Sequence, residues 1–163
     1  MGTGKSSVGR IVAHQLNFAF VDTDQLIEAR TNKSISSIFA EQGEPAFREY
    51  EGKVVRELAS QRHLVIAAGG GLVVEVMNLA SLRQHALVVC LWASPETIWQ
   101  RVCNQTHRPL LQDPDPPGKI QRLLAERKPA YMQADILVNT EQRSVREVAQ
   151  HVIHEFRLAK PGH

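Results

Sequence analysis

The sequence predicts an α/β protein whose parallel sheet carries helices on both faces. Three apolar runs, at residues 64–68, 87–92 and 135–138, are typical of strands that are buried on both sides. Segments with helical periodicity separate these runs, so each strand would connect to the next through a helix. A glycine-rich Lys-Ser segment, residues 2–7, opens directly onto a helix, as phosphate-binding loops do.

Residues 2–7 match the second half of the pattern G-x-x-x-x-G-K-[ST]. Glycines let the backbone point its N–H groups at a phosphate, Lys5 would reach the outer phosphates, and the Ser6 hydroxyl would bind Mg²⁺. Apolar residues then recur at helical spacing from Val8 to Leu16, which predicts the helix behind the loop. A half-pattern alone is equally compatible with a flexible tail, and this helix favours the phosphate loop.

Caps and helix breakers predict the elements of the first half. A short strand at residues 18–22 and a short helix at residues 25–30 come first. Ser34 caps the next helix, which Gly43 is expected to end. Pro45 suits the first turn of another helix.

The second half is punctuated in the same way. Ser94 and Pro95 open a helix with an apolar face. Residues 113–118 contain three prolines and are expected to form a loop before the next helix. Ser144 and Glu147 have the spacing of a capping box, which opens the last helix.

Asp22 and Asp24 lie at the end of the first predicted strand. Being two residues apart, they are expected to point to the same face. Ligands of open parallel sheets bind beyond the carboxyl ends of the strands, so one carboxylate would assist Mg²⁺ and the other a substrate hydroxyl. The alternative is that Asp24 only caps the short helix that follows.

Other candidates are three glycines and three arginines. Residues 69–71 are Gly-Gly-Gly after an apolar strand, which indicates a close approach of ligand or backbone, or else a turn before a helix. Arg48 and Arg127 have the side chain that grips a carboxylate with two parallel N–H bonds, although most arginines are simply solvated. Arg108, ahead of the proline-rich loop, would close over a nucleotide like a lid residue.

Composition limits the function classes. The 163 residues suit one domain, and a net charge of +2 gives no argument for nucleic-acid or membrane partners. No apolar run is long enough to span a bilayer. Cys90 and Cys103 lack metal-ligand or redox spacing, and Cys90 lies in an apolar run as a buried thiol would, which fits a reducing cytoplasm.

Six short motifs follow one another along the chain. They are G-T-G-K-S-S at 2–7, D-T-D at 22–24, F-R-E-Y-E at 47–51, G-G-G at 69–71, R-P-L-L at 108–111 and R-K-P-A-Y at 127–131. With these motifs in this order and spacing, the chain resembles the shikimate kinases over essentially its whole length. The resemblance implies a single P-loop NTPase domain, residues 1–163, of the nucleoside-monophosphate-kinase type. Its sheet would have five parallel strands, its substrate-binding helical region would span about 24–52, and its lid about 103–118.

The resemblance also implies an activity. It is the transfer of a phosphoryl group from MgATP to the 3-hydroxyl of shikimate, in aromatic amino-acid and chorismate biosynthesis, by a cytoplasmic monomer. The implied catalytic residues are Lys5, Asp24 and Arg108. The implied substrate-binding residues are Asp24, Arg48, Gly70, Gly71 and Arg127. The implied nucleotide-binding residues are Gly2, Thr3, Gly4, Lys5, Ser6, Ser7, Arg101, Arg108 and Arg143, and the implied magnesium residues are Ser6 and Asp22.

The start of the sequence departs from this family pattern. The first glycine of the loop pattern would fall before Met1, and the strand that leads into such a loop, central in the family's sheet, is absent. We expect the natural protein to begin about ten residues earlier. Two other functions remain open at this point: a non-catalytic binding module that keeps the substrate pocket, and a kinase of another small hydroxy acid such as gluconate.

Overall fold

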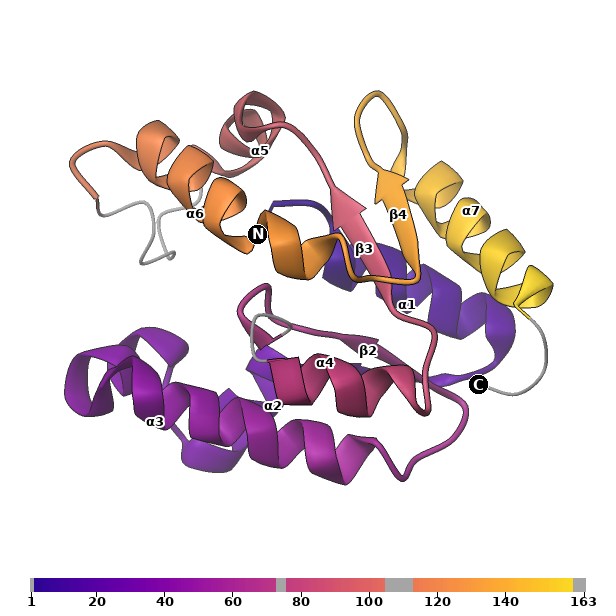
Figure 1. Ribbon diagram of the computed structural model, residues 1–163, viewed down its shortest axis with the longest axis horizontal. Coiled ribbons are helices and arrows are strands. Elements are labelled where there is room, and N and C mark those ends of the chain that lie inside the picture. Colours follow the sequence, from indigo (N-terminus) through magenta and orange to yellow (C-terminus); the bar gives the residue numbers. More distant parts are fainter. Residues whose placement is uncertain (1, 73–75, 105–112, 160–163) are drawn as a thin grey trace.

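The computed structural model describes residues 2–72, 76–104 and 113–159, and Figure 1 shows their arrangement. In chain order the elements are α1 (Lys5–Leu16), β1 (Ala19–Asp22), α2 (Thr23–Thr31), α3 (Ile35–Leu58), β2 (Leu64–Ala67), α4 (Val76–Arg83), β3 (Val89–Trp92), α5 (Pro95–Val102), α6 (Pro116–Tyr131), β4 (Ile136–Asn139) and α7 (Val145–Leu158). The alternation of strands and helices and the parallel pairing confirm the predicted α/β class.

The strands form two separate parallel pairs. β1 pairs with β2 in the register Ala19 to Leu64, and β3 pairs with β4 in the register Val89 to Ile136. Within the described residues, no strand joins β2 to β3. The sheet of five strands implied by the family resemblance is therefore not what these residues form.

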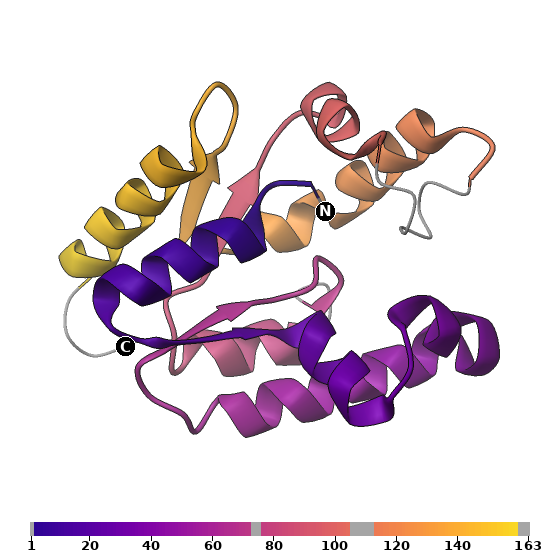
Figure 2. The same cartoon turned by 180° about the vertical axis from the view of Figure 1, so that it is seen from behind.

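Helix α1 joins the two strand pairs. It contacts α7 on one side and both β1 and β2 on the other, and Figure 2 shows it lying between the two pairs. Val8 and Val12 of α1 are buried in one core cluster with Val138, Val148 and Ile153. The apolar stripe predicted for this helix is thus the surface that binds the two halves together.

A cavity of about 1120 Å³ lies between the two strand pairs. Its walls include β2 and β3 along their whole length, and Thr3, Lys5, Gly69 and Gly70 also line it. The strands on its walls are largely apolar. Residues of the phosphate loop and of the glycine turn (residues 69–71) therefore line the same cavity.

The sequence correctly predicts a break at Gly43, and it differs from the structure at a later boundary. Gly43 has the non-helical angles φ 80° and ψ 173°, so α3 consists of two helical segments that meet at a kink, with Pro45 in the first turn of the second segment. Residues 113–118 are not all loop, because α6 begins at Pro116. Prolines at the first turn of a helix lose no hydrogen bond, and Asp115 caps this turn by accepting from the Gly118 N–H at 3.0 Å.

The other predicted helix starts are confirmed. Ser34, Ser94 and Ser144 each accept a bond from the backbone N–H three residues on. At α7 the capping box is complete, since Glu147 also accepts from the Ser144 N–H at 2.7 Å. Helix α4 was not anticipated from the sequence.

Candidate active site

The phosphate loop enters α1 through two glycines in the left-handed region. Gly2 has φ +68° and Gly4 has φ +86°, conformations that side chains with a Cβ rarely adopt. The Ser6 hydroxyl, in the first turn of α1, donates to Asp22 Oδ2 at 2.6 Å. The loop, the helix N-terminus and the end of β1 therefore meet at one point, with hard oxygen atoms side by side.

Asp22, rather than Asp24, caps the helix that follows β1. Its Oδ1 accepts from the N–H groups of Asp24 at 3.1 Å and Gln25 at 3.4 Å. The prediction that strand alternation places both carboxylates on one face is wrong in its reasoning, because β1 ends at Asp22 and Asp24 already belongs to α2. The cap leaves Asp24 available for another role.

Two buried carboxylate oxygens face the same glycine without a partner. Asp24 Oδ1 and Glu51 Oε1 are the buried side-chain oxygens in the described residues that accept no hydrogen bond. A Cβ placed on Gly69 would lie 2.9 Å from the first and 3.0 Å from the second. Both oxygens thus converge on the glycine turn after β2, where unpaired polar atoms are costly unless a ligand satisfies them.

Burial raises the pKa of both carboxyl groups. For Asp24, desolvation acts first and the Asp22 charge adds to it, while the Lys5 ammonium opposes the shift. For Glu51, which is only 1% exposed, desolvation outweighs the hydrogen bond from Arg48. A raised pKa brings a carboxylate closer to the range in which it can take up a proton during a reaction.

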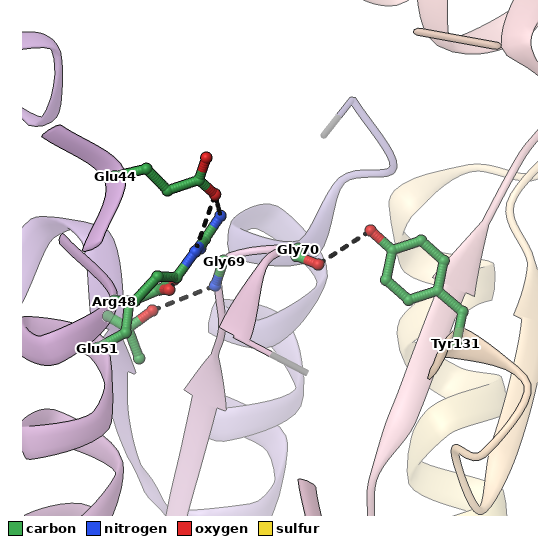
Figure 3. A network of polar contacts seen from close by, with 7 residues as sticks. Glu44, Arg48, Glu51, Gly69, Gly70 and Tyr131 are labelled. Carbon is green, nitrogen blue, oxygen red and sulfur yellow. Dashed lines mark hydrogen bonds and ion pairs between the residues drawn. The ribbon is translucent and has the colours of Figure 1, made fainter. Parts of the chain in front are cut away.

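Arg48 lies on α3 between two glutamates (Figure 3). Its Nη1 donates to Glu51 Oε2 at 2.5 Å, and its Nη2 and Nε donate to Glu44 Oε1 at 2.5 and 3.1 Å. A Cβ on Gly71 would lie 2.1 Å from Arg48 Nη1, so the guanidinium occupies the space that this glycine leaves open. Nη2 and Nε share one Glu44 oxygen, so this ion pair is not the pair of parallel N–H bonds that the sequence predicts between Arg48 and a carboxylate.

The glycine turn is held from both sides. The Gly69 N–H donates to the hydroxyl of Thr23, which is fully buried, at 3.2 Å. On the other side the Tyr131 hydroxyl donates to the Gly70 carbonyl at 3.0 Å (Figure 3), and Arg127 Nη1 would lie 3.5 Å from a Cβ on Gly70. The structure therefore brings Arg127, Arg48 and the glycine turn together.

The predicted nucleotide side is partly assembled. Arg101 on α5 donates to the Thr140 carbonyl at 2.7 Å, to the Thr140 hydroxyl at 2.9 Å and to the Gly2 carbonyl at 3.4 Å. It thus ties the phosphate loop to the loop after β4, which also carries the exposed Arg143. Arg108, the predicted lid residue, lies outside the described residues.

Glu141 fixes the same loop to the start of α5. It accepts from the Ser94 N–H at 2.8 Å and from the Thr97 hydroxyl at 3.1 Å. The hydrogen bonds from Ser94 lower the pKa of Glu141 to about 2. This carboxylate therefore stays ionised and holds the loop over the whole physiological pH range.

Sequence reasoning assigned no role to three residues of this site: Thr23, Glu51 and Tyr131. Each lies inside one of the quoted motifs, and Thr23 and Tyr131 act through glycines that are distant in the chain. A glutamate three residues after Arg48 on a helix signals an ion pair. Nothing in the sequence indicates that it is buried.

Hard oxygen ligands for a magnesium ion are present. Ser6 Oγ and Asp22 Oδ2 are adjacent at the N-terminus of α1. No cluster of three or more His, Cys, Asp or Glu side chains suited to a metal occurs in the described ranges. This donor set fits Mg²⁺, which takes few protein ligands and completes its shell with water and phosphate oxygens.

A phosphate loop opening a helix, a serine hydroxyl beside an aspartate, and parallel strands flanked by helices define a P-loop phosphoryl-transfer protein of the nucleoside-monophosphate-kinase type. A family model described as shikimate kinase matches residues 1–157. The chain belongs to the shikimate kinase family.

Relatives and solved structures agree with this family. A shikimate kinase from Thermodesulfovibrio yellowstonii is 41% identical over 162 residues, which is 99% of this chain and 94% of that protein. One from Synechococcus sp. is 49% identical over 139 residues, 85% of this chain and 73% of that protein. The solved shikimate kinase from Acinetobacter baumannii, in complex with shikimate, has a TM-score of 0.93 and 38% identity, covering 99% of this chain and 90% of that one.

The comparisons and the fold together establish the activity. The chain is an enzyme with shikimate kinase activity, and it uses ATP and shikimate as substrates. No helix in the described part of the chain is long and apolar enough to cross a membrane.

Proposed function

We propose that this chain transfers the γ-phosphoryl group of ATP to the 3-hydroxyl of shikimate at the glycine turn after β2. The observation that carries this proposal is the pair of unpartnered oxygens of Asp24 and Glu51 beside Gly69. They lie next to a phosphate loop and to two arginines, so the site has acceptors for hydroxyl groups and donors for a carboxylate. Shikimate carries both kinds of group.

The phosphate loop holds the nucleotide in this proposal. The N–H groups of residues 2–7 and the N-terminus of α1 surround the phosphates, and Lys5 neutralises the outer ones. Arg101 lies along the adenine, and its guanidinium is fixed by hydrogen bonds to Thr140. Arg143 borders the adenine from the loop after β4. Arg108, which is expected to close over the nucleotide from a lid at about residues 103–118, lies outside the described residues.

Mg²⁺ would be held by Ser6, with Asp22 supporting it through water. Bound there, the ion neutralises charge on the phosphate oxygens. The Ser6–Asp22 hydrogen bond of 2.6 Å supports this assignment, because it fixes both ligands before the metal arrives.

The substrate carboxylate would lie between Arg48 and Arg127, with the backbone of Gly70 and Gly71 beside the ring. The support is geometric: Arg48 Nη1 and Arg127 Nη1 both come within 3.5 Å of where a Cβ on this turn would be. Glu44, which now occupies the outer edge of Arg48, is largely exposed and can leave when the substrate carboxylate enters. The helical region at about 24–52 thus serves shikimate.

Asp24 is the proposed base. Its carboxylate accepts the proton of the 3-hydroxyl as that oxygen attacks the γ-phosphorus and the bond from phosphorus to the bridging oxygen of ADP breaks. Burial beside Gly69 raises its pKa, so the proton acceptor is stronger than an exposed aspartate. Lys5, close enough to oppose this pKa shift, neutralises charge on the transferring group.

We also propose that a central fifth strand fills the space between β2 and β3 in the working enzyme. The facing edges of these strands lack a partner among the described residues, and a cavity of about 1120 Å³ separates them. A strand needs about 160 Å³ per residue, from a ~4.8 Å strand spacing, a ~10 Å sheet spacing and a ~3.3 Å rise. The cavity therefore has room for about seven residues.

A coupled assay of ADP release tests the reaction. With MgATP, release is expected to require shikimate, and neither gluconate nor buffer alone is expected to replace it. Product analysis by ³¹P NMR is expected to place the new ester on the 3-hydroxyl. ADP release driven equally by gluconate would contradict the proposal and favour another hydroxy-acid kinase. Shikimate binding without any ADP release would contradict it too and favour a non-catalytic module.

Sedimentation of the same sample tests the expectation that the protein is a monomer.

A further inference from the structure

Tyr131 is the last residue of α6, and its hydroxyl reaches across the site. It donates to the Gly70 carbonyl at 3.0 Å, as Figure 3 shows. Gly70 follows β2 of one strand pair, whereas α6 leads into β4 of the other pair. The bond therefore joins the two halves of the molecule at the carboxyl end of β2.

The hydroxyl and the Arg127 guanidinium lie over the same glycine. A Cβ on Gly70 would be 2.9 Å from Tyr131 Oη and 3.5 Å from Arg127 Nη1. Arg127 and Tyr131 are four residues apart on α6, so they share one face of that helix. The hydroxyl and the guanidinium therefore both lie beside Gly70, and the hydroxyl also donates to its carbonyl.

The hydroxyl stays a donor at physiological pH. Burial raises the pKa of Tyr131 above its ordinary value, against the opposing effect of Arg127. A protonated hydroxyl can donate to Gly70 and still accept from Arg127 through its lone pairs. It can therefore set the orientation of the peptide group and the position of the guanidinium at the same time.

We propose that Tyr131 is a positioning residue for the substrate carboxylate. Its hydroxyl holds the glycine turn and the Arg127 guanidinium at the spacing at which both engage the same carboxylate, although Tyr131 itself touches neither the nucleotide nor the reacting atoms. This inference rests on the proposed function. It gives a role to a residue that the quoted motif R-K-P-A-Y contains but to which the sequence assigns none.

The substitution Tyr131→Phe tests the proposal because it removes only the hydroxyl. We expect the KM for shikimate to rise about fivefold, as the loss of one such hydrogen bond produces. The kcat and the KM for ATP should stay within about twofold of wild type. Ser60→Ala is the matched control, since it also removes only a hydroxyl: Ser60 is exposed, lies outside the region proposed to bind shikimate, and donates to the Glu57 carbonyl at 3.0 Å.

A second measurement separates positioning from packing. Wild type and Tyr131→Phe are each given shikimate and an analogue whose carboxylate is replaced by hydroxymethyl. The ratio of kcat/KM for the two substrates should fall in Tyr131→Phe, and this ratio does not depend on the fraction of folded enzyme. An unchanged ratio would overturn the proposal. So would an equal rise in the KM for shikimate and in the KM for the analogue. Failure of wild type to phosphorylate shikimate would instead overturn the proposed function.

Discussion

Asp24 shows at the scale of one residue how a catalytic group costs stability. Its Oδ1 is buried without a partner and its pKa is raised, so the folded protein holds a charge that water would solvate better. A folded-state pKa above the unfolded value means that stability is fully present below the unfolded pKa and is lost as the pH rises through the folded pKa. Function and stability therefore conflict at this position.

The substitution Asp24→Asn should separate the effect of this carboxylate on catalysis from its effect on stability. We expect kcat to fall by about 10²- to 10⁴-fold, because the proton acceptor is gone. We also expect the free energy of unfolding, relative to wild type, to increase more at about pH 8 than at about pH 4, because a raised pKa makes the native carboxylate take up a proton more readily as the pH falls. Urea unfolding at both pH values and the ADP assay measure these effects.

A surface carboxylate provides the control for this pH effect. The Lys53 ammonium lowers the pKa of the exposed Glu49, so Glu49→Gln should show the opposite sign and be relatively less stable at the higher pH. An equal stabilisation of the protein by Asp24→Asn at both pH values, relative to wild type, would contradict a pKa of Asp24 that is raised by burial.

Gly71 makes a second prediction at this scale. A Cβ there would lie 2.1 Å from Arg48 Nη1, so Gly71→Ala must push the guanidinium or the turn aside. We expect the KM for shikimate to rise by at least about tenfold, since a displaced arginine loses a two-pronged contact with the carboxylate. The KM for ATP is the internal control. Equal changes in both constants would show that the whole site had shifted and would contradict a local effect.

At the scale of elements, α3 depends on one residue for its shape. Gly43 has φ 80° and ψ 173°, a conformation open essentially to glycine alone. The kink lies between the first helical turns, with Ile38 in the core, and the later ones, with Arg48 and Glu51 at the site. The helix can therefore pack on both sides of the bend.

The substitution Gly43→Ala should be costly for this reason. We expect it to lower the free energy of unfolding by about 1–3 kcal/mol, although a Cβ would meet only Pro45 Cδ at an ordinary 3.6 Å. Ser36→Ala, on the exposed side of the same helix, is the matched control and should be close to neutral. Equal thermal midpoints for the two variants would contradict backbone strain at Gly43.

At the scale of the whole molecule, the cavity between the two strand pairs leads to a prediction about an added strand. A segment of about five Val and Ile residues fused before Met1 can enter it as a strand. At about 2.5 kcal/mol for each buried side chain, less about 1.5 kcal/mol for each ordered residue, the net gain is about 5 kcal/mol. That corresponds to a rise in melting temperature on the order of 10 °C.

A polar segment distinguishes filling of the cavity from the effect of a longer chain. A Ser-Gly-Asn segment of equal length should leave the melting temperature unchanged, because it buries no apolar surface. Scanning calorimetry of both fusions measures the difference. Equal temperatures for the two fusions would contradict the proposed central strand, and an apolar fusion that also raises kcat would link the strand to the seating of the phosphate loop.

Local patterns in the sequence predict the fold class and the order of the elements other than α4, and they name most residues of the candidate site. Apolar runs, serine caps and the Gly-Lys-Ser loop are local signals, because strand burial, helix capping and phosphate binding each need particular residues at fixed short spacing. The motifs also named Asp24, Arg48 and Arg127. The roles that the family resemblance gives to these residues, and to Arg108, stay predictions.

Which side chains come into contact depends on how the elements pack in three dimensions. The tertiary structure assigned the cap of α2 to Asp22, joined Glu51 to Arg48 inside the protein, and brought Tyr131 onto Gly70 from 61 positions away. It also divided the strands into two pairs with a cavity between them. Burial and long-range contact depend on how whole elements pack, and a short spacing along the chain carries no record of that packing.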